Sequence, residues 1–210
     1  MARPVVLTGF NDDDPAFYAS GLIHDGFANL VVGSHGGGFD VEFFTGAQMK
    51  AWIGAINNKR GHEFNEEVAE EFRKLGFQAR ASVQMTEFNV PSEMGDLGDI
   101  DVLAWNGSDK AYIVECKKLR FAMTVGEIVD QLNRFRGEAN DELAKHMKRF
   151  LWLGQHPDRL AKTIRCYGRL ELVPLLVTNT IVPMQFSQDL PIPSESIMPT
   201  GALSQRLSRH

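Results

Sequence analysis

The stretch that decides the fold is GDIDVLAWNGSDKAYIVECKK, residues 98–118. Two runs of strand-forming residues, DIDVLAW and AYIVECKK, flank the turn sequence NGSDK, and this arrangement predicts a β-hairpin. Successive side chains of a strand point to opposite faces of the sheet. Glu115 and Lys117 are therefore expected on one face of the second strand, and Cys116 on the other.

Acidic residues occur on both strands of this hairpin. Asp99 and Asp101 share one face of the first strand, as Glu115 and Lys117 do on the second. In a paired hairpin, Asp101 and Glu115 come near one another with Lys117 beside them. Because burial disfavours the charged form of a carboxyl group, either one acid takes up a proton or a cation satisfies both. A small set of oxygen ligands suits Mg²⁺ or Mn²⁺.

A divalent ion held in this way points to phosphodiester hydrolysis. Such an ion lowers the pKa of a bound water and neutralises the charge that develops on a phosphate oxygen. Lys117 would orient that water or help to deprotonate it, and would offset the phosphate charge. The alternative is a salt-bridge ladder on a solvated hairpin face, because Glu and Lys two residues apart are common there.

The order of these residues, with the amphipathic helix that precedes them, resembles the PD-(D/E)XK nuclease superfamily. The likeness is greatest to its restriction-endonuclease-like and Holliday-junction-resolvase-like branches, and it covers residues 61–135. It implies that Asp101 is the first acidic metal ligand and that Glu115 and Lys117 are the E-x-K pair. It also implies that the backbone carbonyl of Cys116 is a further metal ligand and that two ions bind when substrate is present.

One position departs from the pattern of the superfamily. The helix before the strands usually carries a Glu directly after the aromatic residue of G-x-x-F, and here Asn65 stands in that place, followed by Glu66 and Glu67. Asn65 can still contact a metal ion or a water. Glu67 flanks the apolar stripe of the helix and is a candidate substitute, whereas Glu66 points nearly opposite the stripe and suits the helix dipole.

Residues around the hairpin are candidates for contacts with the substrate. Gln131 and Phe135 form Q-x-x-x-F, which is similar to the Q-x-x-x-Y element of some nucleases in the superfamily, although a polar residue at the edge of an apolar stripe would look the same. Asp99 is an accessory candidate because it shares the face of Asp101. Four basic residues after the second strand are candidate phosphate contacts, with ordinary surface basicity as the alternative: Lys118, Arg120, Arg134 and Arg136.

Composition and charge limit the class of protein. The chain has 210 residues, of which 43% are apolar and 23% charged, enough for one sizeable core. A net charge of −5 argues against a protein that coats nucleic acid through bulk charge. Residues 1–110 carry 8 Lys+Arg and 17 Asp+Glu, and residues 111–210 carry 14 and 10, so the basic second half could face a polyanion or be solvated surface.

Other chemistries lack their motifs. Cys116 and Cys166 show no disulfide or zinc spacing. The segment SHGGGF at residues 34–39 is similar to an esterase oxyanion segment, but no G-x-S-x-G accompanies it, and we interpret it as a glycine-rich hairpin loop. The chain also lacks the phosphate-binding G-x-x-x-x-G-K-[ST] and the dinucleotide-binding G-x-G-x-x-G.

The pattern along the chain predicts three segments. Residues 1–45 alternate short apolar runs, including ANLVVG and FDVEFF, with turn signals and predict a β-rich N-terminal extension. Residues 46–185 predict a nuclease-like α/β domain, a restriction-endonuclease-like central mixed sheet of four or five strands flanked by helices. Residues 186–210 are rich in Pro and Ser and predict a loosely structured tail.

Local signals place several helices and a strand in the central segment. One helix is expected to end at NNKRG, and a second to run from His62 to a C-cap at Gly76. The capping box TVGE at residues 124–127 predicts the start of another helix, and Pro157 the start of a short one. Pro174 within ELVPLLVTN predicts an irregular or edge strand.

We therefore expect a Mg²⁺- or Mn²⁺-dependent endonuclease that hydrolyses DNA in preference to RNA. The alternative, motivated by Asn65, is a nucleic-acid-binding or assembly module that keeps the nuclease fold but not its turnover. Because a lone nuclease domain seldom chooses its target, we expect a homodimer or a part of a larger complex, in restriction or antiviral defence by analogy of fold. No apolar run reaches the ~18 residues of a membrane span, which predicts a cytoplasmic protein without a membrane partner.

Overall fold

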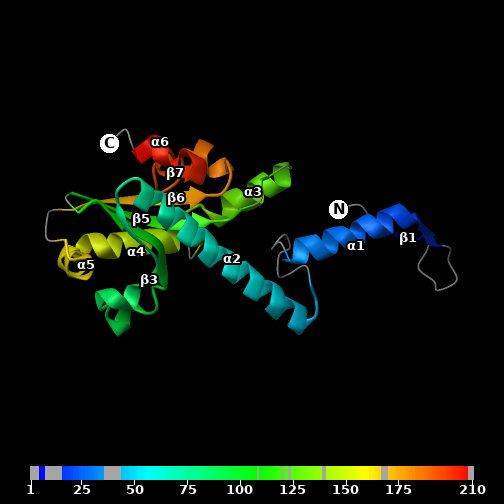
Figure 1. The fold of residues 1–210 in the computed structure, drawn as a ribbon, viewed down its shortest axis with the longest axis horizontal. Coiled ribbons are helices and arrows are strands. Elements are labelled where there is room, and N and C mark those ends of the chain that lie inside the picture. Colours follow the sequence, from blue (N-terminus) through cyan, green and yellow to red (C-terminus); the bar gives the residue numbers. More distant parts are fainter. Residues whose placement is uncertain are drawn as a thin grey trace. The chain divides into compact units, whose positions relative to one another are not determined.

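Figure 1 shows a computed structural model of the chain, which describes residues 5–7, 16–35, 44–107, 109–119, 121–122, 124–138, 141–166 and 170–207. The chain forms two compact units, Met1–Arg60 and Gly61–His210. Within the described residues, no helix has both the length and the apolar character needed to cross a membrane.

The first unit begins with a short antiparallel hairpin. β1 (Val5–Leu7) pairs with β2 (Ala16–Tyr18), in line with the strand-and-turn pattern of this part of the sequence. α1 (Ser20–His35) follows and contains the run ANLVVG, so the strand expected there is wrong. The apolar residues of that run continue a spacing of three and four residues that begins at Ile23, which is the period of a helix.

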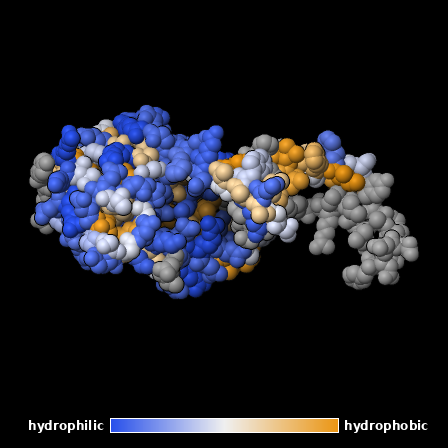
Figure 2. Space-filling view, turned by 90° about the horizontal axis from the view of Figure 1, so that it is seen from below, coloured by the Kyte–Doolittle hydropathy of each residue, from blue (hydrophilic) through white to orange (hydrophobic). Residues whose placement is uncertain are grey.

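Apolar side chains gather on the surface of the first unit (Figure 2). Those on α1 with exposed side chains are Leu22, Ile23, Phe27, Leu30 and Val31. Of the predicted glycine-rich loop, Ser34 and His35 form the end of α1, and the remainder lies outside the described residues, as does most of FDVEFF.

One continuous helix, α2 (Ala47–Lys74), replaces the two helices expected on either side of NNKRG. Gly61 disfavours a helix by only about 1 kcal/mol relative to Ala. Burial of Phe64 and Phe72 at 2% and 0% exposure, worth about 2 kcal/mol each, outweighs that penalty. The end of the helix is as predicted, with Gly76 at a φ of +87° just beyond it.

A five-stranded mixed sheet lies at the centre of the second unit, as the sequence predicts. The strand order is β3-β4-β5-β6-β7; β3, β4 and β5 pair antiparallel, and β5, β6 and β7 pair parallel. The bounds are Gln78–Gln84 for β3, Asp99–Trp105 for β4, Lys110–Lys117 for β5, Glu171–Thr178 for β6 and Ile197–Pro199 for β7. The hairpin predicted from the sequence is thus β4 and β5.

β6 is an internal strand, but Pro174 lies in a part of it that has a partner strand on one side only, in line with the predicted edge position. Pro174 lies opposite Ile113 of β5, and β7 pairs only with residues 176–178 of β6. The proline therefore stands before the β7 pairing begins, where its missing N–H breaks no ladder on that side.

Helices cover both faces of the sheet (Figure 1). α2 packs Phe64 and Phe72 against a face that includes Val114. α4 (Glu142–Gln155) and α5 (Pro157–Ile164) pack against the opposite face, and Pro157 opens α5 as predicted. α3 (Val125–Arg134) begins at the predicted capping box, in which the side chain of its N-cap residue accepts a hydrogen bond from the N–H three residues on.

The C-terminal segment is packed, so the expectation of a loosely structured tail is wrong. β7 extends the sheet and α6 (Leu203–Leu207) follows it. Buried apolar side chains, among them Ile192 and Ile197, anchor this segment against β6 and the residues around α3. Five short 3-10 helices complete the described residues: Met85–Phe88, Ser92–Met94, Pro183–Phe186, Ser194–Ser196 and Thr200–Ala202.

Candidate functional site

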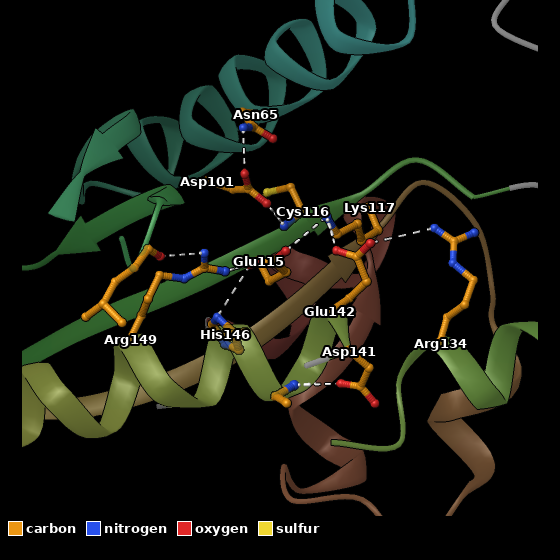
Figure 3. Close-up of polar contacts among 12 residues, drawn as sticks. Asn65, Asp101, Glu115, Cys116, Lys117, Arg134, Asp141, Glu142, His146 and Arg149 are labelled. Carbon is orange, nitrogen blue, oxygen red and sulfur yellow. Dashed lines mark hydrogen bonds and ion pairs between the residues drawn. The ribbon is translucent and has the colours of Figure 1, made fainter. Parts of the chain in front are cut away.

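The candidate site lies where the ladder between β4 and β5 reaches Val102 opposite Val114. The next residue along each strand is acidic, Asp101 on β4 and Glu115 on β5 (Figure 3). The peptide N–H of Cys116 donates to Asp101 Oδ2 at 2.8 Å, so the side chain of Asp101 bridges the two strands.

Strict alternation along β4 predicts that Asp101 and Leu103 share a face of the sheet. In the structure they do not. Asp101 Oδ1 accepts a hydrogen bond at 3.0 Å from Asn65 Nδ2 of α2, on the face opposite the cluster that contains Leu103. Ile100 packs into the Leu103 cluster instead. The alternation shifts beside Ser82 of β3, whose φ of 52° lies in the left-handed region and disturbs the regular pleat.

Asn65, at the position where the resemblance to the nuclease superfamily predicts a Glu, is only 5% exposed. Its amide donates to Asp101 and lowers the pKa of that carboxyl group, against the larger effect of burial, which raises the pKa. A Glu in this place would set a second carboxylate against Asp101 without a donor between them. An amide at position 65 therefore suits the neighbouring carboxylate of Asp101 better than a Glu would.

Glu115 is buried at 4% exposure and holds two cations. Its Oε1 lies 3.0 Å from Lys117 Nζ, and its Oε2 lies 2.5 Å from a terminal nitrogen of Arg149 on α4. His146, also on α4, places Nδ1 3.8 Å from the same Oε2. Figure 3 shows these side chains converging on the end of β5.

The two acids affect each other's charge. Burial raises the pKa of Glu115 to about 7, and the charge of Asp101 is the second cause; Lys117 and Arg149 lower it by less. Burial likewise raises the pKa of Asp101, opposed by Lys117, the Cys116 N–H and Asn65. Burial also raises the pKa of the Cys116 thiol well above its ordinary value, so this side chain stays neutral and packs in the core.

Lys117 lies between two carboxylates. Its Nζ is 3.0 Å from Glu115 and 2.9 Å from Glu142, the first residue of α4, and Arg134 of α3 lies 3.9 Å from the other oxygen of Glu142. Burial alone would lower the pKa of Lys117, but Glu115, Glu142 and Asp101 together raise it above its ordinary value. The ammonium group therefore stays charged at neutral pH, which suits a role in orienting a water or offsetting phosphate charge rather than in removing a proton.

Three residues of the site were absent from the sequence prediction: Glu142, His146 and Arg149. They stand at i, i+4 and i+7 of α4, on one face of the helix. His146 and Arg149 are buried at 1% and 7% exposure. The signal in the sequence was this polar stripe beside an apolar one that includes Leu143 and Leu153, since buried cations require a partner.

His146 is a neutral member of the site. Burial is the largest cause, and together with the charges of Arg149 and Lys117 it lowers the pKa of His146 to about 3. Its Nε2 has no hydrogen-bond partner among the described residues.

The remaining predicted residues lie in different places. Asp99 is half-buried at the start of β4, and its charge contributes to the raised pKa of Asp101. Glu67 is exposed on α2, and Gln131 is half-buried on α3. Lys118 is exposed, with its ammonium 5.9 Å from the ring centroid of Phe64, and Arg120 lies outside the described residues.

A divalent ion fits the donor chemistry of the site. Asp101 and Glu115 offer oxygen atoms from neighbouring strands, and the backbone carbonyl of Cys116 directly follows Glu115 in the sequence. Among the described residues, no group of three His, Cys, Asp or Glu is placed to hold a metal ion. Two carboxylates and a backbone carbonyl are oxygen donors of the kind that Mg²⁺ takes, and Mg²⁺ usually keeps several waters in its shell.

The fold and the site define an α/β protein with a central mixed sheet and a buried cluster of acids and cations at the end of its β4–β5 hairpin. The chain belongs to the Upx-like family of anti-phage proteins, whose family model matches residues 1–197. It is thus a protein of antiviral defence. Neither the curated proteins nor the solved structures yielded a match, so the restriction-endonuclease-like architecture stays a prediction.

Proposed function

We propose that this protein is a metal-dependent nuclease that hydrolyses phage nucleic acid, with DNA as the preferred substrate. The observation that carries the proposal is the convergence of Asp101, Glu115 and Lys117 at one end of the hairpin, in a site buried enough to raise the pKa of Glu115 to about 7. Membership of an anti-phage family supports nucleic acid as the target, because the genome of a phage is a substrate that defence can destroy.

Asp101, Glu115 and the carbonyl of Cys116 would hold Mg²⁺ or Mn²⁺. The ion would supply an activated water and neutralise the charge that develops on the phosphate. Lys117, held as a cation by Glu115 and Glu142, would orient the attacking water and stabilise the same charge.

Exposed cations near the end of β5 would position the nucleic-acid backbone. Lys118 follows the site directly and is exposed, and Arg134 has a 54% exposed side chain. Contacts of this kind make binding fall steeply as salt rises. Gln131 would reach the substrate or a bound water from α3. A homodimer or a larger complex would select the target.

A cleavage assay with a matched control tests the proposal. Purified protein is incubated with linear, nicked and branched DNA and with RNA, in Mg²⁺ or Mn²⁺, and compared with Lys117→Met and Glu115→Gln. Lys110→Met is the control, since Lys110 lies at the other end of the same strand. We expect parent and control to cleave and the two site variants to lose cleavage by about a hundredfold or more. The same variants are expected to lose protection in phage plating assays.

A second candidate is a nucleic-acid-binding or assembly module without turnover. It is favoured by one observation: the four oxygens of Asp101 and Glu115 each already have a protein partner, namely Asn65, the N–H of Cys116, Lys117 and Arg149. Binding of DNA without products in either metal, with protection that survives Lys117→Met, would favour the module over the nuclease.

A further inference from the structure

Arg149 is held through both of its terminal nitrogens. One terminal nitrogen lies 2.5 Å from Glu115 Oε2, and the other donates at 3.3 Å to the backbone carbonyl of Leu97, in the loop that leads into β4. Gly98 lies beside the guanidinium, and its φ of +74° is a backbone conformation that favours glycine. With 7% exposure, the side chain is closed off from bulk solvent and fixed at both ends.

The network around Arg149 is balanced in formal charge. Four acids face four basic residues in it: Asp99, Asp101, Glu115 and Glu142 against Lys117, Arg134, Lys145 and Arg149. A divalent ion that enters this network adds two positive charges without an acid to balance them. A phosphodiester group supplies negative charge and lessens that imbalance.

We propose that Arg149 acts as an internal cation on Glu115 that weakens the binding of a divalent ion until a nucleic-acid phosphate is present. The inference rests on the proposed function for the assignment of Asp101 and Glu115 as metal ligands. In this view Arg149 is a positioning residue: it keeps Glu115 oriented without metal, and it couples metal binding to substrate binding. By reciprocity, the ion must raise the affinity for nucleic acid by the same factor.

The direction of the effect follows from charge alone. Glu115 can be free, protonated or bound to Mn²⁺, and the Mn²⁺-bound state carries the most positive charge. Removal of a neighbouring positive charge therefore favours the Mn²⁺-bound state over the other two. Neutralising Arg149 should therefore tighten Mn²⁺ binding in the absence of nucleic acid. Replacing Arg149 with lysine, which keeps the positive charge, should not tighten Mn²⁺ binding.

Mn²⁺ binding, followed by the electron paramagnetic resonance signal of free Mn²⁺, tests the inference without any cleavage. Titrations are made with and without a DNA duplex whose phosphorothioate backbone resists hydrolysis. For the parent chain we expect the duplex to tighten Mn²⁺ binding by about tenfold or more. Arg149→Gln is expected to bind Mn²⁺ more tightly than the parent when the duplex is absent. Arg149→Lys is expected to bind Mn²⁺ as the parent does, and so is the control Arg80→Gln on β3.

Each result decides the matter. Equal Mn²⁺ affinities of the parent and Arg149→Gln overturn the inference, and if that binding is lost in Glu115→Gln the proposed metal site still stands. No Mn²⁺ binding by any form, with or without duplex, overturns both proposals. Should Arg149→Gln fail to fold by circular dichroism, the parent alone decides, because equal affinity with and without the duplex contradicts the coupling.

Discussion

Replacing Glu115 with glutamine should remove cleavage and stabilise the fold above neutral pH. Burial and Asp101 raise the pKa of this carboxyl group from 4.5 to about 7. Between those values the folded chain keeps a proton that the unfolded chain has lost, so the free energy of unfolding falls as the pH rises from 4.5 to about 7. The difference corresponds to about 3 kcal/mol, since one pKa unit is worth about 1.4 kcal/mol.

Glutamine resembles the protonated acid and does not ionise, so the variant escapes this loss. Urea unfolding of parent and variant at about pH 5 and about pH 8 measures the effect. The free energy of unfolding of Glu115→Gln, relative to that of the parent, is expected to rise by about 3 kcal/mol between the two conditions. Glu93→Gln, at an exposed residue, is the control and should show no such rise.

The opposite result would show that the reasoning is wrong. Arg149 and Lys117 attract the charged form of Glu115, and if that attraction exceeded the penalty of burial, the parent would gain stability over the variant as the pH rises. A difference that is equal at both pH values would also refute it. Cleavage is measured on the same preparations, so that a variant that is more stable yet inactive separates loss of function from loss of fold.

Three further substitutions test local features by urea unfolding at neutral pH. Asn65→Asp removes the donor to Asp101 and adds a carboxylate, and should destabilise the fold by about 2 kcal/mol, less at acid pH; equal stability would contradict the role of the amide. Gly137→Ala should cost about 2 kcal/mol or more, because φ is +79° and a Cβ atom would overlap the ring of Pro191. Thr124→Ala removes the capping box of α3 and should cost about 1 kcal/mol, and an unchanged midpoint would show that the cap is not needed.

One hairpin of the sheet and two helix starts could be predicted from the sequence because their signals are local. The β4–β5 hairpin, the helix start at Thr124 and the helix start at Pro157 each depend on a few neighbouring residues. The merging of two expected helices into α2 and the packing of the C-terminal segment could not be read in this way. Both depend on burial against distant strands, as with Ile197, and this burial offsets weak local propensity.

The site was predictable only in part, for a related reason. Asp101, Glu115 and Lys117 stand at fixed spacings within one hairpin, so the strand pairing places Asp101 and Glu115 on neighbouring positions of β4 and β5. Glu142 and Arg149 come from α4, and their place beside Glu115 depends on how that helix crosses the sheet, which no local pattern encodes. The face of Asp101 was also unpredictable, since it depends on the backbone of Ser82 on another strand.

The two acids of the hairpin each receive a contact from a helix outside it. Asn65 approaches Asp101 from the helix on one face of the sheet, and Arg149 approaches Glu115 from the helix on the other. Two buried acids side by side repel one another, and in this chain each acid has a donor that the hairpin cannot supply. The hairpin sequence therefore specifies the acids, but only the packing of both helical layers makes their proximity tolerable. It follows that a substitution in α2 or α4 that loosens either helix should disable the site even though the hairpin sequence is untouched.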